Sequence, residues 1–251
     1  MIGIFFTARL GSTRLAQKHL IDVGGRSFIQ WLVGRYINEF DREIKENDVK
    51  IFITTSVDPL NKEFENVFLP EEVTVFYGSD ANIPLRHLEC ATANDIEYII
   101  SVDGDDILCS SSAAKMVVEK LRAGSEMVQT KGLPLGMNVM GYRSSFLKSS
   151  LSGHSQVKLE TGWGKIFDQN KIEVIEIPGF EKDNQLRMTL DYEDDASFFK
   201  TVIASIGNEI LTISDKDLVD RININNWQKL NIGLNNIYWE NFNKQKLEEN
   251  N

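Results

Sequence analysis

The chain has 251 residues, of which 42% are hydrophobic and 25% are charged, and its formal net charge is −10. This length and composition predict a folded protein, either one large domain or a core with a small appendage. The acidic balance disfavours a nucleic-acid-binding protein, whose affinity depends on neutralising phosphates, so any anionic ligand needs a local cluster of cations. We find no apolar run as long as a membrane helix, which needs roughly 18 residues. No signal peptide is apparent, so we expect a cytoplasmic protein whose two cysteines, Cys90 and Cys109, are buried free thiols.

The first half of the chain alternates strand-like runs with helical patterns. Apolar runs predict strands over residues 2–6, 49–54, 73–76 and 98–102. Apolar residues at helical spacing predict helices over residues 28–40, 60–68, 85–94 and 112–121. The charged run 41–48 is expected to be a solvated loop. Such alternation predicts an α/β fold, with a mostly parallel, Rossmann-like sheet and helices on both faces.

The second half is less regular. We expect strands over residues 137–142, 172–177 and 187–190 and a helix over residues 193–206. From residue 222 the chain is rich in Asn, and we expect a partly ordered tail whose aromatic residues dock on the domain or on a partner. The predicted division is therefore a single domain over residues 1–221, with an inserted region at about 132–180, and a polar tail over residues 222–251.

The stretch TARLGSTRLAQK, residues 7–18, follows the first predicted strand. In an open α/β sheet, ligands bind beyond the carboxyl ends of the strands, which is where this loop must begin. It carries three cations, which suit phosphate oxygens: Arg9, Arg14 and Lys18. It also carries three small residues that offer N–H or hydroxyl donors: Gly11, Ser12 and Thr13.

The loop is neither a Walker A sequence nor a dinucleotide-binding GxGxxG. Its composition favours phosphate binding, and the alternative is a solvated loop with scattered charges. As cations of an exposed loop, Lys18 and Arg14 are expected to contribute little to stability.

Two aspartates follow predicted strands and are candidate metal ligands. Asp105 comes after residues 98–102 and Asp191 after residues 187–190, so both side chains are expected at the carboxyl edge of the sheet. A hard cation that bridges phosphates is held by one or two carboxylates together with water and substrate oxygens. The alternative is that each aspartate simply caps the next helix.

Several stretches, in chain order, resemble the motifs of one enzyme family. ARLGSTRLAQKHL resembles ARxGSTRLPxKxL, the signature of cytidylyltransferases that make CMP-activated sugars, with Ala16 in place of the usual Pro. GSDANIPLRHLECA, SVDGDDIL and RMTLDYEDDASFF are similar to later motifs of the family, with Ile107 in place of another Pro. The pattern resembles the spore-coat polysaccharide cytidylyltransferase-like family, which is related to the CMP-ketodeoxyoctonate and CMP-acylneuraminate synthetases.

The resemblance is weaker where the family binds its acceptor. LPLGMNVMGY is similar to the stretch at which the acceptor pocket begins. VKLETGWGKIF, residues 157–167, keeps Glu160 but has Thr161, Gly162 and Trp163 where relatives have a His. The identity of the acceptor therefore stays open.

The resemblance implies a fold like that of nucleotide-diphospho-sugar transferases. It implies transfer of CMP from CTP to an acidic or phosphorylated sugar-like acceptor, with Mg²⁺ as cofactor and pyrophosphate as product, for surface polysaccharide or glycoconjugate biosynthesis. A homodimer is expected, without a nucleic-acid or membrane partner. The implied catalytic residues are Arg9, Arg14, Lys18 and Asp105, and the implied metal ligands are Asp105 and Asp191. The implied nucleotide-binding residues are Thr7, Ala8, Arg9, Gly11, Ser12, Thr13, Arg14, Lys18, Ser79, Arg86 and Asp103.

Two other functions stay open from the sequence. A glycosyltransferase has a similar sheet and an acidic metal-binding motif, although it normally lacks the GSTR…K loop. A catalytically idle nucleotide-binding protein would account for the two missing prolines and the altered acceptor stretch. The three histidines form no catalytic or metal-binding pattern and are expected to be surface or packing residues: His19, His87 and His154.

Overall fold

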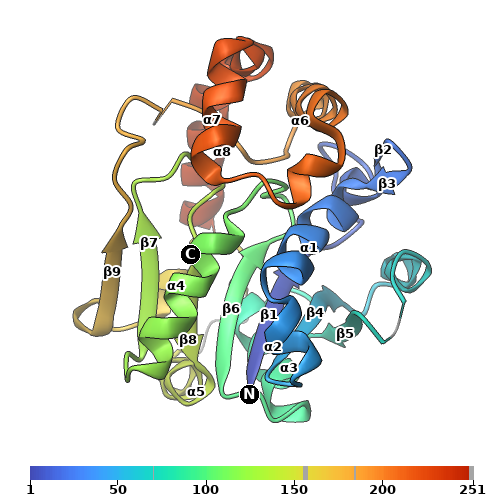
Figure 1. Ribbon diagram of the computed structural model, residues 1–251. Helices are drawn as coiled ribbons and strands as arrows, with labels where there is room; N and C mark the ends of the chain where they lie inside the picture. Colours follow the sequence, from blue (N-terminus) through green and yellow to red (C-terminus); the bar gives the residue numbers. More distant parts are fainter. Residues whose placement is uncertain (70, 155–157, 184, 249–251) are drawn as a thin grey trace.

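A computed structural model describes residues 1–69, 71–154, 158–183 and 185–248 of the chain. Within these residues, seven strands form a sheet in the order β5-β4-β1-β6-β8-β7-β9 (Figure 1). The strands are β1 (Ile2–Thr7), β4 (Val49–Ser56), β5 (Thr74–Gly78), β6 (Tyr98–Asp103), β7 (Met127–Lys131), β8 (Met140–Arg143) and β9 (Ile172–Glu176). All neighbouring pairs are parallel except the two that β8 makes with β6 and β7. The predicted α/β fold with a mostly parallel sheet is confirmed.

The central strand β1 positions the site. Its sequence, IGIFFT, has no charged residue, and every residue except Thr7 is buried, as expected for a parallel strand covered on both faces. It pairs with β4 and β6, and Thr7 at its end lies opposite Thr54 and Asp103. The loops that follow β1 and β6 therefore start side by side at one edge of the sheet.

Helices cover both faces of the sheet (Figure 1). Phe6 belongs to a core cluster with residues of α1 and α4, whereas its neighbour Phe5 belongs to a second cluster with residues of α3 and α5. Successive side chains of a strand point to opposite faces, so β1 serves both layers. The α-helices are α1 (Phe28–Glu39), α2 (Asp41–Lys45), α3 (Ile83–Ala93), α4 (Ser111–Arg122), α5 (Ser144–Ser152), α6 (Glu193–Ile206), α7 (Asp215–Ile224) and α8 (Asn235–Glu248). The 3₁₀ helices are η1 (Lys18–Leu20), η2 (Pro59–Asn66), η3 (Trp163–Ile166), η4 (Gln169–Lys171), η5 (Gly207–Leu211), η6 (Trp227–Leu230) and η7 (Ile232–Leu234).

A small hairpin connects the first loop to α1. Its strands, β2 (Asp22–Val23) and β3 (Arg26–Ser27), are joined by Gly24 and Gly25, whose φ angles of 65° and 84° suit glycine. Ser27 then begins α1 with a capping box, in which the Ser27 N–H donates to the Gln30 side chain at 2.8 Å. The hairpin thereby fixes where the loop of residues 7–18 ends.

Residues 187–190 were expected to be a strand, and this prediction is wrong. The N–H groups of Met188 and Leu190 donate to the carbonyls of Leu135 and Asp105, each at 2.8 Å, which lie in loops. The segment is extended but has no strand beside it with which to form a ladder.

Other differences concern short elements. Residues 60–68 hold the 3₁₀ helix η2 in place of an α-helix, and the run 41–48 contains α2. The strand predicted over residues 137–142 begins only at Met140, and β7, α5, α7 and α8 were not predicted. Cys90 and Cys109 are buried and free, as predicted.

The C-terminal segment is helical as far as Glu248. α7 crosses residue 221, and η6, η7 and α8 follow it. Trp227 packs against the main core and Asn231 is buried, so this part of the chain is joined to the rest. The division at residue 221 stays a prediction. None of the described helices is long and apolar enough to cross a membrane.

Candidate active site

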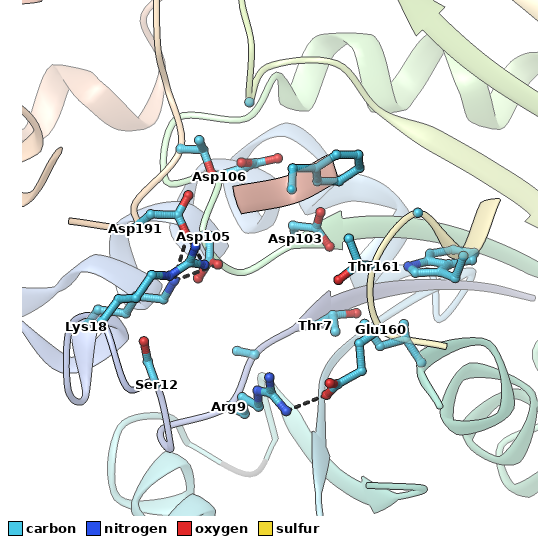
Figure 2. A pocket seen from close by; sticks show the side chains of 18 of the residues that line it. Thr7, Arg9, Ser12, Lys18, Asp103, Asp105, Asp106, Glu160, Thr161 and Asp191 are labelled. Carbon is cyan, nitrogen blue, oxygen red and sulfur yellow. Dashed lines mark hydrogen bonds and ion pairs between the residues drawn. The ribbon is translucent and has the colours of Figure 1, made fainter. Parts of the chain in front are cut away.

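A pocket of about 700 Å³ lies where β1 and β6 end (Figure 2). It is lined by every predicted site residue except Ser79: Thr7, Ala8, Arg9, Gly11, Ser12, Thr13, Arg14, Lys18, Arg86, Asp103, Asp105 and Asp191. Ser79 instead supports a neighbour, since its carbonyl accepts from Arg86 Nε at 2.8 Å and its N–H donates to the Glu89 carboxylate at 2.8 Å. The fold thus gathers residues from both halves of the chain around one cavity.

Lys18 occupies the centre of the polar network. Its Nζ lies 2.7 Å from Asp105 Oδ2 and 3.7 Å from Asp191 Oδ1, and it donates to the Leu190 carbonyl at 2.7 Å (Figure 2). Only 5% of its side chain is exposed, whereas 35% of Arg14 and 52% of Arg9 are exposed. The expectation that Lys18 and Arg14 are exposed loop cations is therefore wrong for Lys18. The loop folds back so that this lysine neutralises two carboxylates beneath it.

The two arginines of the loop pair with different walls of the pocket. Arg14 donates to Asp191 Oδ1 at 2.7 Å and lies over the ring of Tyr192, 5.5 Å from its centroid. Arg9 forms an ion pair with Glu160 across the pocket (Figure 2). Every cation of the loop is thus paired with a carboxylate of this acidic chain.

Asp105 is held between a lysine and a histidine. His19 Nε2 donates to Asp105 Oδ1 at 2.8 Å, opposite the Lys18 ion pair. Burial alone would raise the pKa of Asp105, but the Lys18 charge and the His19 hydrogen bond outweigh it and hold the pKa well below its usual range. Asp105 is therefore ionised and available to a cation. His19 is buried, and its contact with Asp105 was missed from the sequence, where it was expected to be a surface or packing residue; its position directly after Lys18 is the only signal that could have indicated it.

The pKa values of the neighbouring aspartates, Asp103 and Asp106, are shifted upward, opposite to the shift of Asp105. Burial and the charge of Asp105 raise the pKa of Asp103 to about 6. Burial and the charge of Asp103 raise the pKa of Asp106 well above its usual value. Both shifts favour the neutral carboxyl, and a cation bound nearby would act in the opposite direction.

Asp191 is the most enclosed acidic group of the pocket. Its Oδ2 accepts from Arg187 Nη2 at 2.9 Å, and Arg187 Nε donates to Asp195 Oδ1 at 2.8 Å. Asn231 donates to the same Asp195 oxygen at 2.9 Å. Asp195 also accepts from the N–H groups of Asp191 and Tyr192, so it caps α6 and fixes the turn that carries Asp191.

The structure brings Asp105 and Asp191 together, as predicted. Both carboxylates contact the same nitrogen atom of Lys18, and the Leu190 N–H donates to the Asp105 carbonyl at 2.8 Å. Within the described part of the chain, no three His, Cys, Asp or Glu side chains gather as a metal site of protein ligands alone. The pair fits Mg²⁺, which accepts one or two carboxylates when phosphate and water oxygens complete its shell.

The other end of the pocket is built around Thr7. Its Oγ1 forms a hydrogen bond with His87 Nε2 at 2.7 Å, and His87 Nδ1 forms one with the Tyr142 hydroxyl at 2.6 Å. Arg86 is almost fully buried and donates to the carbonyls of Ser79 and Asp80. The structure therefore gives two of the three histidines, His19 and His87, hydrogen bonds to predicted site residues, while His154 is exposed.

His87 is expected to make the stability of the protein depend on pH. Its pKa is lowered to about 3, mainly by burial and also by the Arg86 charge, whereas an unfolded histidine has a pKa of about 6.5. Between these values the unfolded chain binds a proton that the folded chain does not bind. The free energy of unfolding therefore falls as the pH falls through this window, by up to about 1.4 kcal/mol per pH unit from this group.

Urea unfolding at about pH 7 and about pH 5.5 checks this, because His87→Gln should lose about 1 kcal/mol of the difference between the two pH values. His154→Gln is the control and should keep the wild-type difference, since His154 is exposed. An unchanged difference in His87→Gln would contradict the assignment of a neutral, buried His87.

The expected acceptor stretch forms the wall opposite the loop. Leu135, Gly136 and Met140 line the pocket, as do residues 160–164. Trp163 is buried against His87, with ring centroids 5.8 Å apart, and also contacts Tyr142. Val157, the first residue of the divergent stretch, lies outside the described residues. The Trp that replaces the family's usual sequence thus packs beside the Thr7 end of the pocket.

Two pocket residues come from the C-terminal helix and were not predicted. Tyr238 and Phe242 of α8 line the cavity, four residues apart on one face of the helix. The sequence offered only the spacing of the aromatic residues as a signal, and this spacing equally fits packing.

Comparison with known proteins identifies the family to which this fold and this pocket belong. The sequence profile described as "Cytidylyltransferase" matches residues 4–212. A solved cytidylyltransferase from Leptospira borgpetersenii serovar Hardjo-bovis is 22% identical, with a TM-score of 0.77 over 90% of this chain and 95% of that one. At this identity the structural likeness establishes a shared fold.

More distant solved structures share this fold. One is a CMP:2-keto-3-deoxy-manno-octonic acid synthetase in complex with CTP, 13% identical, with a TM-score of 0.57 over 81% of this chain and 98% of that one. Another is a 4-diphosphocytidyl-2C-methyl-D-erythritol synthase from Anaerococcus prevotii, 15% identical, with a TM-score of 0.53 over 80% and 97% of the two chains. The resemblance seen in the sequence motifs is thereby confirmed. With the profile covering most of its length, the chain belongs to the cytidylyltransferase family of nucleotidyltransferases.

Proposed function

We propose that this protein transfers CMP from CTP to an acidic or phosphorylated sugar-like acceptor and releases pyrophosphate. The observation that carries the proposal is the network around Lys18, in which loop cations face a pair of converging carboxylates. A triphosphate with a divalent cation complements both groups, because its oxygens suit the arginines and the lysine and its metal suits the carboxylates. Binding then exchanges one set of ion pairs for another.

In the proposed reaction an acceptor oxygen attacks the α-phosphorus, a new oxygen–phosphorus bond forms, and the bond to the leaving pyrophosphate breaks. Arg14 and Lys18 would hold the β- and γ-phosphates and offset the charge that develops on pyrophosphate. Asp105 and Asp191 would hold Mg²⁺, which when bound polarises phosphate oxygens. The main contribution of the protein is to position the two reactants, since little covalent chemistry falls to its side chains.

The nucleoside would lie toward Thr7 and Arg86, at the far end of the pocket from Asp191. Arg9, Gly11, Ser12 and Thr13 line the cavity and would offer donors to a base and a ribose. The preference for cytosine is proposed from the family of the chain.

Synthesis of a CMP-activated sugar for a surface polysaccharide or glycoconjugate is the biological role that we propose. A homodimer formed through the region at about 132–180 belongs to the same proposal.

CTP with Mg²⁺ should raise the melting temperature more than ATP, GTP or UTP at equal concentration. A ligand that binds only the folded state stabilises it by about 2.7 kcal/mol at a hundredfold excess over Kd, or about 5–10 °C for a chain of this size. A thermal-shift panel with Mg²⁺, repeated with EDTA, measures this. A larger shift with UTP or a purine nucleotide would reject cytidylyl transfer and keep nucleotide binding.

The reaction is then tested by pyrophosphate release with CTP, Mg²⁺ and a panel of acidic and phosphorylated sugars. Release that depends on both Mg²⁺ and an acceptor supports the proposal. Transfer of a sugar from a nucleotide sugar without release of pyrophosphate would identify a glycosyltransferase instead.

A further inference from the structure

The C-terminal helix α8 lies outside the family match, which ends at residue 212, yet it supplies a wall of the pocket. In Figure 2 the red α8 ribbon passes beside Asp103 and Asp106. Tyr238 and Phe242 line the cavity, whereas Ile237 and Trp239 are 47% and 48% exposed. The helix therefore presents one aromatic face to the pocket and another to solvent.

The helix is anchored to residues that carry the site. Asn241 donates to the hydroxyl of Tyr192 at 2.8 Å, and Tyr192 directly follows Asp191. The guanidinium of Arg187 lies 4.5 Å from the centroid of the Tyr238 ring, and its Nη2 also donates to Asp191 Oδ2 at 2.9 Å. A cation over a ring face fixes the plane of that ring. The position of Tyr238 is thus set by the same arginine that orients a proposed metal ligand.

The place of this wall indicates what it contacts. The acceptor oxygen must come within about 3–3.5 Å of the α-phosphorus, beside the carboxylates that would hold the metal. The loop of residues 7–18 lies on one side of these carboxylates, so the acceptor must enter from another side. Tyr238 lies on such a side, because it comes from α8 and lines the same cavity as Asp103, Asp106 and Asp191.

We propose that Tyr238 and Phe242 form the acceptor-binding wall and stack against the ring of a sugar-like acceptor. Aromatic faces carry partial negative charge and attract the C–H groups of a sugar ring, while its hydroxyl and acidic groups remain free to contact the polar side of the pocket. This inference rests on the proposed function and assigns acceptor recognition to a segment beyond the family match.

The test compares Tyr238→Ala and Phe242→Ala with wild type in the pyrophosphate-release assay, with CTP and acceptor varied separately. We expect the KM for the acceptor to rise at least tenfold in both variants. The KM for CTP should change less than threefold. The shift of Tm that Mg²⁺ and CTP produce should stay close to that of wild type. Tyr238→Phe keeps the flat face and should retain the wild-type KM. Ile237→Ala removes apolar bulk from the exposed side of the same helix and is the matched control.

Each other outcome is informative. A rise in the KM for CTP in place of the acceptor, or an equal loss in Ile237→Ala, would overturn the inference and leave the proposed function intact. Stabilisation of wild type by CTP without turnover of any sugar in the panel would overturn the assigned acceptor class. Absence of any stabilisation by nucleotides would overturn the proposed function and the inference together.

Discussion

Alanine at position 14 or 18 is expected to lower kcat/KM for pyrophosphate release by about a thousandfold, the loss typical of removing one fixed charge from a transferring phosphate. Arg14 Nη2 lies 2.7 Å from Asp191 Oδ1, and Lys18 Nζ lies 2.7 Å from Asp105 Oδ2. A bound triphosphate and its metal would take over these partners. Neither cation can be replaced by water, because the charge must already be in place when the leaving group departs.

The two variants should differ in stability. Lys18 is buried and neutralises two carboxylates, so Lys18→Ala leaves charge uncompensated and should cost about 3 kcal/mol of the free energy of unfolding. Arg14 is one-third exposed, and Asp191 keeps Arg187, so Arg14→Ala should cost about 1 kcal/mol. Both costs are smaller than the total stability of an ordinary domain, so both variants should fold.

Circular dichroism, urea unfolding and steady-state kinetics at a temperature where all variants are folded provide the measurement. Lys45→Ala is the control, because Lys45 is exposed and pairs with Asp41 of its own helix, outside the pocket lining. Turnover within tenfold of wild type in both Arg14→Ala and Lys18→Ala would reject the phosphate-binding role of the loop.

The sheet could be predicted because its strands carry their own signal. β1, β4 and β6 are short apolar runs, and parallel strands buried on both faces tolerate little else. Their common direction places Thr7 and Asp103 at one edge, which is why the pocket could be anticipated. β7 was not predicted because Gln129 and Lys131 interrupt its short apolar run.

The partners of the site residues could not be predicted, since they depend on how segments far apart in sequence meet. Lys18 was expected on an exposed loop, but the loop folds inward over two aspartates and buries it. Asp191 was placed at the end of a strand that does not form, and it reaches the site through loop hydrogen bonds. The predicted position of Asp191 beside Asp105 was therefore right, although the strand from which it was predicted does not form.

The tail shows a second limit of sequence reasoning. The aromatic residues near the C-terminus fit a docking stripe and a pocket wall equally well, because both need the same helical spacing. Only the docking of α8 against Tyr192 and Arg187 separates Tyr238 from the exposed Trp239. The contacts of α8 therefore show which aromatic residues line the pocket, which the helical spacing alone could not show.

Asparagine at position 105 or 191 should reduce activity about a thousandfold and raise the Mg²⁺ concentration needed for half-maximal rate at least tenfold. The substitution keeps the size of the side chain but removes the charge that a hard cation requires. Asp105 is ionised beside Lys18 and His19, and the carboxylate of Asp191 contacts the same Lys18 nitrogen. Each aspartate therefore provides a metal ligand that the other cannot replace.

The stability of these variants separates metal binding from folding. Asp191→Asn leaves the buried Arg187 with Asp195 as its remaining carboxylate and should cost about 2 kcal/mol. Asp105→Asn leaves the buried Lys18 with Asp191 as its remaining carboxylate and should cost about 1–2 kcal/mol, because Lys18 and His19 stabilise the charge of Asp105 in the folded protein. Asp194→Asn, at an exposed carboxylate in the first turn of α6, is the control and should keep both activity and Mg²⁺ dependence. Since the cost of Asp105→Asn is far below the stability of an ordinary domain, this variant should fold, and a wild-type Mg²⁺ dependence in it would show directly that the carboxylate pair does not hold the metal.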